Sequence, residues 1–126
     1  MRLVDTDVLI WYLRGNRRAA VAIDRGDPFC ISAVTYIELV QGMRNRDELR
    51  ALRRALQSWG ARVLHVDTEI SARALYYVEQ HFLAHAVRLA DALVAATAVC
   101  HGLALLTANV RHYRALGDVE LALFRP

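Results

Sequence analysis

Short apolar runs alternate along this chain with longer stretches in which apolar residues recur every three or four positions. The short runs predict strands at Leu3-Val4, 28–31, 62–66, 103–106 and, as an edge strand, 119–124. The longer stretches predict helices at 8–13, 17–25, from a cap at Ser32 to about Met43, 48–59, from Asp67 or Thr68 to about Leu83, 89–101 and 110–116. This alternation indicates an α/β fold, and we expect a three-layer α/β/α sandwich with a central parallel sheet. Residues 1–126 are predicted to form a single domain.

Several local features refine this picture. Asn16, Ser32 and Asn109 are placed to cap the helices that follow them. The helix at 89–101 is apolar nearly all round, so we expect it to be central and buried. Residues 44–47 are predicted to form a turn, and residues 81–88 fit either a helix or a loop.

The composition describes a folded protein without a membrane anchor. A hydrophobic content of 56% allows a real core. No apolar run approaches the ~20 residues of a membrane span, and residues 1–5 do not resemble a signal peptide, so we expect a cytoplasmic protein. Cys30 and Cys100 lie in apolar segments and are expected to be buried free thiols in a reducing compartment.

The charge adds a weak indication of an anionic partner. All 16 basic residues are arginine, and the net charge is +3. Arginine suits phosphate, which favours nucleic acid, although genomic base composition also explains an excess of arginine over lysine.

Acidic and amide side chains follow three of the predicted strands. Asp5 and Asp7 come directly after the first, Glu38 lies on the helix after the second, and Asn109 follows the fourth by way of Thr107. The loops after these strands of a parallel sheet can converge on one crevice. We therefore expect these side chains to face a common site.

Asp91 is the one acid in the most apolar helix of the chain. It either joins the acidic site or satisfies the free N–H groups of its own helix, with Arg88 as a potential partner. Two unit charges ~4 Å apart repel by ~4 kcal/mol at an effective dielectric near 20, so a carboxylate cluster needs a cation. Oxygen ligands select Mg²⁺ or Mn²⁺ over Zn²⁺, and Mg²⁺ keeps waters, one of which can attack a phosphate.

Four motifs in this chain resemble those of the PIN-domain ribonucleases, and within them the VapC-type toxins of bacterial toxin–antitoxin pairs. Each motif alone is weak, but all four occur in the family's order and spacing and cover essentially the whole chain. They are Val4–Ile10, Ser32–Leu39, Leu89–Ala98 and Leu106–Tyr113.

The resemblance implies a metal-dependent endoribonuclease in which Asp5, Glu38 and Asp91 hold Mg²⁺ or Mn²⁺. Asn109 stands at the fourth site position, where many relatives carry Asp, and its amide brings no charge. Asp7 stands where relatives often carry Asn, and it either adds charge to the site or caps the following helix. The resemblance also implies an RNA substrate, a homodimer, and a cognate antitoxin that blocks the acidic crevice.

Thr6 and Thr107 lie beside these positions. Their hydroxyls either orient the carboxylates or waters of the site, or cap the neighbouring helices.

Two other functions remain open. The run Asp5-Thr6-Asp7 also resembles the nucleophile motif of haloacid-dehalogenase-type phosphatases, in which the first Asp is phosphorylated. That reading leaves Glu38 unexplained, and the chain lacks the lysine and the Asp-Asp pair expected of such an enzyme. The other alternative is a PIN-like scaffold that only binds RNA or protein.

The remaining polar and aromatic signals are less informative. His81 and His85 have the spacing of a zinc pair but no third ligand, which favours an exposed helix face. Arg111 and His112 either touch substrate phosphate or mark a solvated helix end. The basic stretch, comprising Arg44, Arg46, Arg50, Arg53 and Arg54, is either a rim that guides RNA or a solvated face. An aromatic set is expected in the core or on a dimer face: Trp11, Tyr12, Tyr76, Tyr77 and Phe82.

Overall fold

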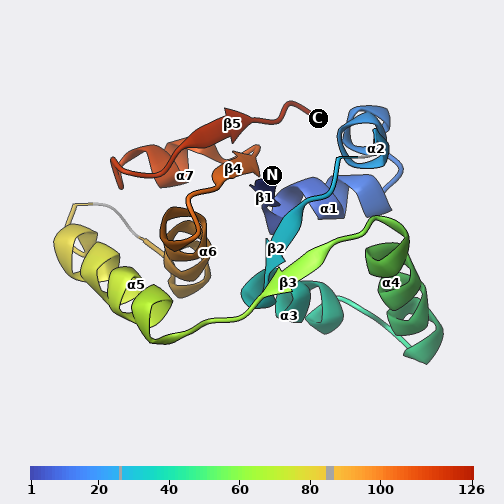
Figure 1. Ribbon diagram of the computed structural model, residues 1–126, viewed down its shortest axis with the longest axis horizontal. Coiled ribbons are helices and arrows are strands. Elements are labelled where there is room, and N and C mark those ends of the chain that lie inside the picture. The colour runs from blue at the N-terminus through green and yellow to red at the C-terminus, as the bar shows by residue number, and fades with distance from the viewer. Residues whose placement is uncertain (26, 85–86) are drawn as a thin grey trace.

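A computed structural model describes residues 1–25, 27–84 and 87–126. Its centre is a five-stranded sheet in the order β3-β2-β1-β4-β5, and every pair of neighbouring strands is parallel (Figure 1). The strands are β1 (Arg2–Val4), β2 (Cys30–Ser32), β3 (Arg62–Leu64), β4 (Ala104–Thr107) and β5 (Leu121–Leu123). The predicted parallel sheet and its edge strand are therefore confirmed.

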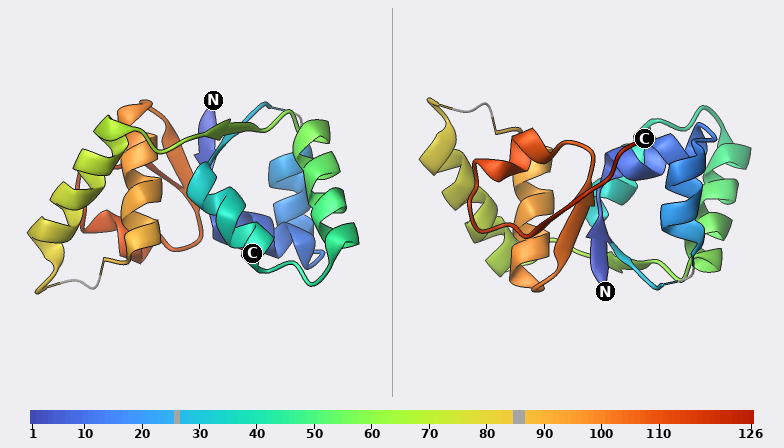
Figure 2. Two further views of the ribbon diagram at one scale, coloured as in Figure 1. Left: turned by 90° about the horizontal axis from the view of Figure 1, so that it is seen from below. Right: turned by 90° about the horizontal axis from the view of Figure 1, so that it is seen from above.

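Helices cover both faces of this sheet. They are α1 (Thr6–Leu13), α2 (Arg17–Asp24), α3 (Ala33–Gln41), α4 (Arg46–Ser58), α5 (Thr68–His81), α6 (Leu89–Cys100) and α7 (Val110–Arg114). Helices α5, α6 and α7 lie on one side, and α1, α2 and α4 lie on the other (Figure 2). The α/β/α sandwich that the sequence predicts is thus the fold of the chain.

Two hydrophobic clusters fill the space between the sheet and its helices. Neighbouring strand residues point to opposite faces, so Leu3 packs with α5 and α6 while Val4 packs with α1 and α2. Helix α6 is buried along most of its length, as expected from its apolar sequence, and its buried residues are Ala92, Val94, Ala95, Ala96, Thr97 and Ala98. Both cysteines are free, but Cys100 is only half-buried, so burial holds for Cys30 alone.

Two helices begin earlier than the sequence pattern predicts. Helix α1 begins at Thr6, not Val8, because the Asp5 side chain accepts a hydrogen bond from the Thr6 N–H. Helix α4 begins at Arg46, within the predicted turn, because Asn45 caps it. At the ambiguous segment 81–88, α5 ends at His81 and a turn follows over 82–84.

The sheet brings three strand ends together at one edge. Strand β1 lies between β2 and β4, and Val4 is aligned with Leu106, the residue before Thr107. The Asp5 N–H donates to the Leu106 carbonyl at 2.9 Å, which fixes Asp5 beside the end of β4.

None of the described helices is long and apolar enough to span a bilayer.

Candidate active site

Asp5 is the most buried acid of the site, with 6% of its surface exposed. Its Oδ1 accepts the N–H of Thr6 at 2.8 Å, and its Oδ2 accepts the hydroxyls of Thr107 at 2.8 Å and Tyr113 at 3.0 Å. Burial, with a further contribution from the charge of Asp7, raises the pKa of Asp5 to about 7. The three donors only partly offset the loss of solvent, so this carboxylate is poorly neutralised.

Asp7 faces the same strand end from the first turn of α1. Its Oδ2 accepts the N–H of Ala108 at 3.0 Å and lies 3.4 Å from the Thr107 hydroxyl. Burial raises the pKa of Asp7 as well. Its Oδ1 is buried and has no hydrogen-bond partner among the described residues. Asp5, not Asp7, occupies the capping position of α1, so the capping role considered for Asp7 is wrong.

Asp91 extends toward these two acids from the first turn of α6. Its Oδ2 lies 3.5 Å from Nδ1 of His112, and its Oδ1 lies 3.4 Å from the Tyr113 hydroxyl. The predicted pairing with Arg88 is not present, and Arg88 makes no capping bond with its side chain. Asp91 therefore takes its contacts from α7, and His112 belongs to the edge of the site.

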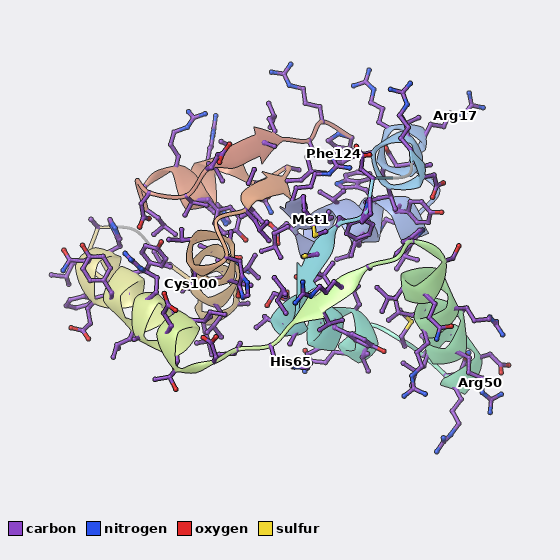
Figure 3. All side chains as sticks on the ribbon, in the orientation of Figure 1. Met1, Arg17, Arg50, His65, Cys100 and Phe124 are labelled. Carbon is purple, nitrogen blue, oxygen red and sulfur yellow. The ribbon has the colours of Figure 1, made fainter. Side chains whose placement is uncertain are left out.

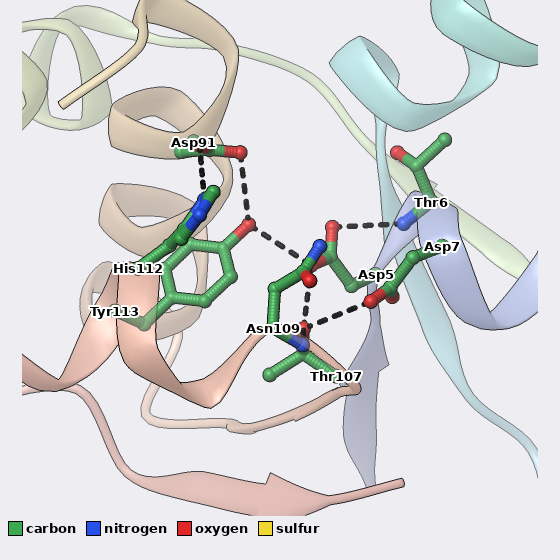
Figure 4. Close-up of polar contacts among 8 residues, drawn as sticks. All are labelled: Asp5, Thr6, Asp7, Asp91, Thr107, Asn109, His112 and Tyr113. Carbon is green, nitrogen blue, oxygen red and sulfur yellow. Dashed lines mark hydrogen bonds and ion pairs between the residues drawn. The ribbon is translucent and has the colours of Figure 1, made fainter. Parts of the chain in front are cut away.

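Tyr113 connects the acids, and sequence reasoning missed it. Its side chain is 1% exposed, and its hydroxyl points between Asp5 and Asp91 (Figure 4). Burial and the charge of Asp5 raise its pKa far above the ordinary value, so the phenol keeps its proton. The available signal was its place four residues after Asn109, at the end of the fourth motif and on the short helix α7.

Thr107 and Asn109 join the site from the end of β4. The fully buried Thr107 hydroxyl donates to Asp5 and accepts the N–H of Asn109 at 3.0 Å. It therefore orients a carboxylate, as one of its two predicted roles requires. Asn109 occupies the capping position of α7, but its side chain makes no capping hydrogen bond.

Glu38 lies on the far side of Thr6 from Asp5. It is exposed on α3, and its Oε1 lies 2.8 Å from the Thr6 hydroxyl, which is also 2.9 Å from the Thr35 hydroxyl. A carboxylate only accepts and a hydroxyl has one proton, so Thr6 donates to Glu38 and accepts from Thr35. Thr6 thus contacts one acid through its backbone N–H and another through its hydroxyl.

The structure therefore gathers Asp5, Asp7 and Asp91 around β1 and β4, with Glu38 linked through Thr6. Among the residues that the structure describes, no three His, Cys, Asp or Glu side chains form a ready-made set of metal ligands. The oxygen-only donors and the unpartnered Oδ1 of Asp7 nevertheless fit a hard divalent cation. The His112 ring, whose Nδ1 lies 3.5 Å from Asp91 Oδ2, is charged only when protonated.

The other candidate residues are spread over the surface and the core. Arg50 projects away from the body of the protein, 3.6 Å from Asp47, while Arg44 pairs with Glu48 at 3.0 Å (Figure 3). Arg44 also lines a hollow of about 810 Å³ that includes Glu38.

The predicted histidine pair and aromatic set are divided. His81 ends α5, and His85 lies outside the described residues. Tyr77 is fully buried, whereas Tyr76 and Phe82 are exposed. Trp11 and Tyr12 pack against the hydrophobic cluster that contains Val4 and lies between the sheet and helices α1 and α2.

The protein is a parallel α/β sandwich with acids at the carboxyl ends of its central strands. Comparison with known families identifies the family to which this fold and site belong. The model of the PIN domain matches residues 2–117. The chain belongs to the PIN-domain family. It is 39% identical to "Ribonuclease VapC10" of Mycobacterium tuberculosis over 117 residues, which cover 90% of this chain and 86% of the relative. It is 34% identical to "Ribonuclease VapC19" of the same species, over 95% of this chain and 98% of the relative.

Solved structures give the same fold. A toxin–antitoxin complex from Klebsiella pneumoniae matches with a TM-score of 0.80 and 27% identity, over 94% of this chain and 95% of the other. FitAcB from Neisseria gonorrhoeae matches with a TM-score of 0.75 and 27% identity, over 96% of each chain. Membership of the PIN family decides against the haloacid-dehalogenase alternative.

Proposed function

We propose that this protein is an endoribonuclease that hydrolyses RNA phosphodiester bonds with Mg²⁺ or Mn²⁺, and that it acts as the toxin of a toxin–antitoxin pair. The observation that carries the proposal is the convergence of Asp5, Asp7 and Asp91, with one buried oxygen of Asp7 left without a partner in the part of the chain that the structure describes. Such a cluster is unfavourable without a cation. The names of the curated relatives, which are ribonucleases, support the choice of RNA.

Asp5, Glu38 and Asp91 would hold the cation, with Asn109 beside them. When bound, a divalent cation supplies a Lewis acid for the phosphate and lowers the pKa of water. The surrounding residues of the chain position the carboxylates for that task. Thr107 fixes one oxygen of Asp5, and Thr6 fixes both the other oxygen of Asp5 and the carboxylate of Glu38.

The test compares alanine variants of the three acids in an RNA cleavage assay. We expect Asp5→Ala, Glu38→Ala and Asp91→Ala each to abolish cleavage, and EDTA to abolish it in the wild type. Asp27, an exposed carboxylate away from the site, provides the matched control, because Asp27→Ala should cleave like the wild type. Full activity after exhaustive chelation would contradict the proposal.

The fold of each variant must be checked separately from its activity. Removing one acid from a repelling cluster should leave the melting temperature of metal-free Glu38→Ala and Asp91→Ala unchanged or raised, whereas in Asp5→Ala the loss of the α1 cap and of an acceptor for two hydroxyls offsets part of the gain. A large fall in all three variants would instead assign the acids to structural pairing. Binding of RNA by the wild type without cleavage in Mg²⁺ or Mn²⁺ would favour the non-catalytic scaffold.

A cognate antitoxin is the proposed partner, in the cytoplasm. The solved complex from Klebsiella pneumoniae is titled as a toxin–antitoxin complex, which supports a similar partnership here. The acidic cluster suits insertion of a basic side chain. We expect the co-expressed antitoxin to inhibit cleavage in proportion to its occupancy.

A second copy of the chain is the other proposed partner. Leu75 on α5 is 60% exposed and Leu89 on α6 is 73% exposed, and both line a hollow of about 670 Å³ between these helices. Exposed apolar surface of this kind marks interaction sites. Sedimentation should give a dimer for the wild type and a monomer for Leu75→Glu.

A further inference from the structure

One buried hydroxyl is shared by two of the carboxylates that would hold the cation. The Tyr113 oxygen lies 3.0 Å from Asp5 Oδ2 and 3.4 Å from Asp91 Oδ1 (Figure 4). Asp5 comes from the junction of β1 and α1, and Asp91 comes from α6. Because Tyr113 belongs to α7, three separate elements meet at this hydroxyl.

The hydroxyl reaches the two acids from the interior of the protein. Tyr113 is 1% exposed, Asp5 is 6% exposed, and the Asp91 side chain is 27% exposed. The ring packs in the hydrophobic cluster formed with α5 and α6, so the hydroxyl has little freedom to move. It therefore sets where the inner oxygens of the two carboxylates lie.

We propose that Tyr113 is a positioning residue that holds Asp5 and Asp91 together for a divalent cation. The inference rests on the proposed metal-dependent activity and adds a residue to its machinery. The hydroxyl has one proton, so Asp5 at 3.0 Å and Asp91 at 3.4 Å compete for it, and the shorter contact is the stronger one. Without the phenol between them, the two carboxylates lose this shared contact and their mutual repulsion is free to separate them. Partners that hydrogen-bond to metal ligands in this way are worth roughly tenfold to a hundredfold in metal affinity.

The protein contains a matched control for this bond. Tyr77 on α5 is also fully buried, and its hydroxyl donates to Asp118 Oδ1 at 2.7 Å. This bond has the same chemistry as that of Tyr113 but involves none of the site's acids. Tyr77→Phe thus removes a buried phenol–carboxylate bond without touching the site.

The experiment is a calorimetric titration of Mn²⁺ into RNA-free protein at fixed pH. We expect Tyr113→Phe to bind Mn²⁺ roughly tenfold more weakly than the wild type, and Tyr77→Phe to bind it like the wild type. Circular dichroism establishes that each variant is folded. In a cleavage assay, Tyr113→Phe should need about tenfold more Mn²⁺ for half-maximal rate, with kcat at saturation little changed.

The possible results separate this inference from the proposed function. Absence of Mn²⁺ binding to the wild type overturns both. If Tyr113→Phe binds Mn²⁺ with wild-type affinity, the positioning role is overturned and the metal site remains. If Tyr113→Phe binds Mn²⁺ more tightly than the wild type, the hydroxyl obstructs the cation, which also overturns the positioning role. If Tyr77→Phe loses as much Mn²⁺ affinity as Tyr113→Phe, the weaker binding comes from general destabilisation, and the positioning role of Tyr113 is overturned.

Discussion

Replacing Asp5 with asparagine should stabilise the metal-free protein, and the gain should depend on pH. Asparagine has the size of aspartate, and its Oδ1 can still accept the Thr6 N–H and cap α1, while its NH2 can donate to the hydroxyls of Thr107 and Tyr113, whose donation to Asp5 Oδ2 is lost. It lacks the charge that is unfavourable in this buried position. The change of the stability difference with pH therefore reports the ionisation of Asp5, because any effect of the altered hydrogen bonds that does not depend on pH cancels.

The magnitude follows from the two pKa values of the carboxyl. The pKa of Asp5 is about 7 in the folded protein and 3.8 without the protein environment. Between these values the folded state holds a proton that the unfolded state has released, so the unfolding free energy falls as the pH rises. The contribution is fully present below pH 3.8 and is lost by about pH 7. At 1.36 kcal/mol per pKa unit, the whole loss is about 4 kcal/mol, of which about 3 kcal/mol falls between pH 5 and 8.

Urea unfolding in EDTA at pH 5 and pH 8 measures this contribution. The stability of Asp5→Asn minus that of the wild type should be about 3 kcal/mol larger at pH 8 than at pH 5. The exposed control Asp27→Asn should show no such change with pH. Adding Mn²⁺ at pH 8 should raise the stability of the wild type more than that of Asp5→Asn, because ligand binding stabilises the folded state that binds it.

One outcome would refute the reasoning. If the two proteins differ by the same amount at both pH values, Asp5 is ionised in both states throughout this range. The carboxylate would then be well neutralised by its three hydrogen-bond donors, and the argument that the acids need a cation would lose its main support.

Three further predictions use the other contacts of the site. Asp7→Asn should also stabilise the metal-free protein more at pH 8 than below pH 3.8, because burial raises the pKa of Asp7 above 3.8; urea unfolding measures this, and an unchanged difference would argue against it. Thr107→Val should lower cleavage at limiting Mn²⁺ by roughly tenfold or more, because it removes a donor to Asp5, whereas the same change at the exposed Thr68 should have no effect. RNA fragments should carry 5′-phosphate and 3′-hydroxyl ends in end-labelling assays, because the proposed nucleophile is water. Cyclic 2′,3′-phosphate ends would mean that the 2′-OH of the RNA attacks, with His112 as the residue to test.

The order of strands and helices was predictable because the spacing of apolar residues within each segment distinguishes a strand from a helix. Leu3 and Val4 face opposite sides of the sheet, and both sides are covered, which is why an uninterrupted apolar pair marked a buried strand. The helix starts were harder, because the sequence Asp5-Thr6-Asp7 offers more than one possible cap. Only the folded backbone shows that the Asp5 side chain accepts the Thr6 N–H.

The convergence of the acids was predictable because parallel strands end on one side of the sheet, but only the folded sheet shows that β1 lies beside β4 and Asp5 next to Thr107. The partners of those acids were not predictable in the same way. Arg88 is the neighbour of Asp91 in sequence, yet the contacts of Asp91 come from His112 and Tyr113 on another helix. Tyr113 itself has the spacing of a core residue, and it is one, so the role of its hydroxyl depends on tertiary contacts.

The energetics of the site are an argument about function in their own right. A domain of this size is stable by only about 5–15 kcal/mol, so a loss of about 4 kcal/mol through one ionised side chain is a large fraction. The donors around Asp5 and Asp7 hold the two acids in fixed positions without neutralising them, and one oxygen of Asp7 has no hydrogen-bond partner among the residues that the structure describes. A fold under no functional demand would gain stability from a single neutral substitution here. These energetics support the proposal that the carboxylates bind a cation, because the acids do not contribute to the stability of the metal-free sandwich.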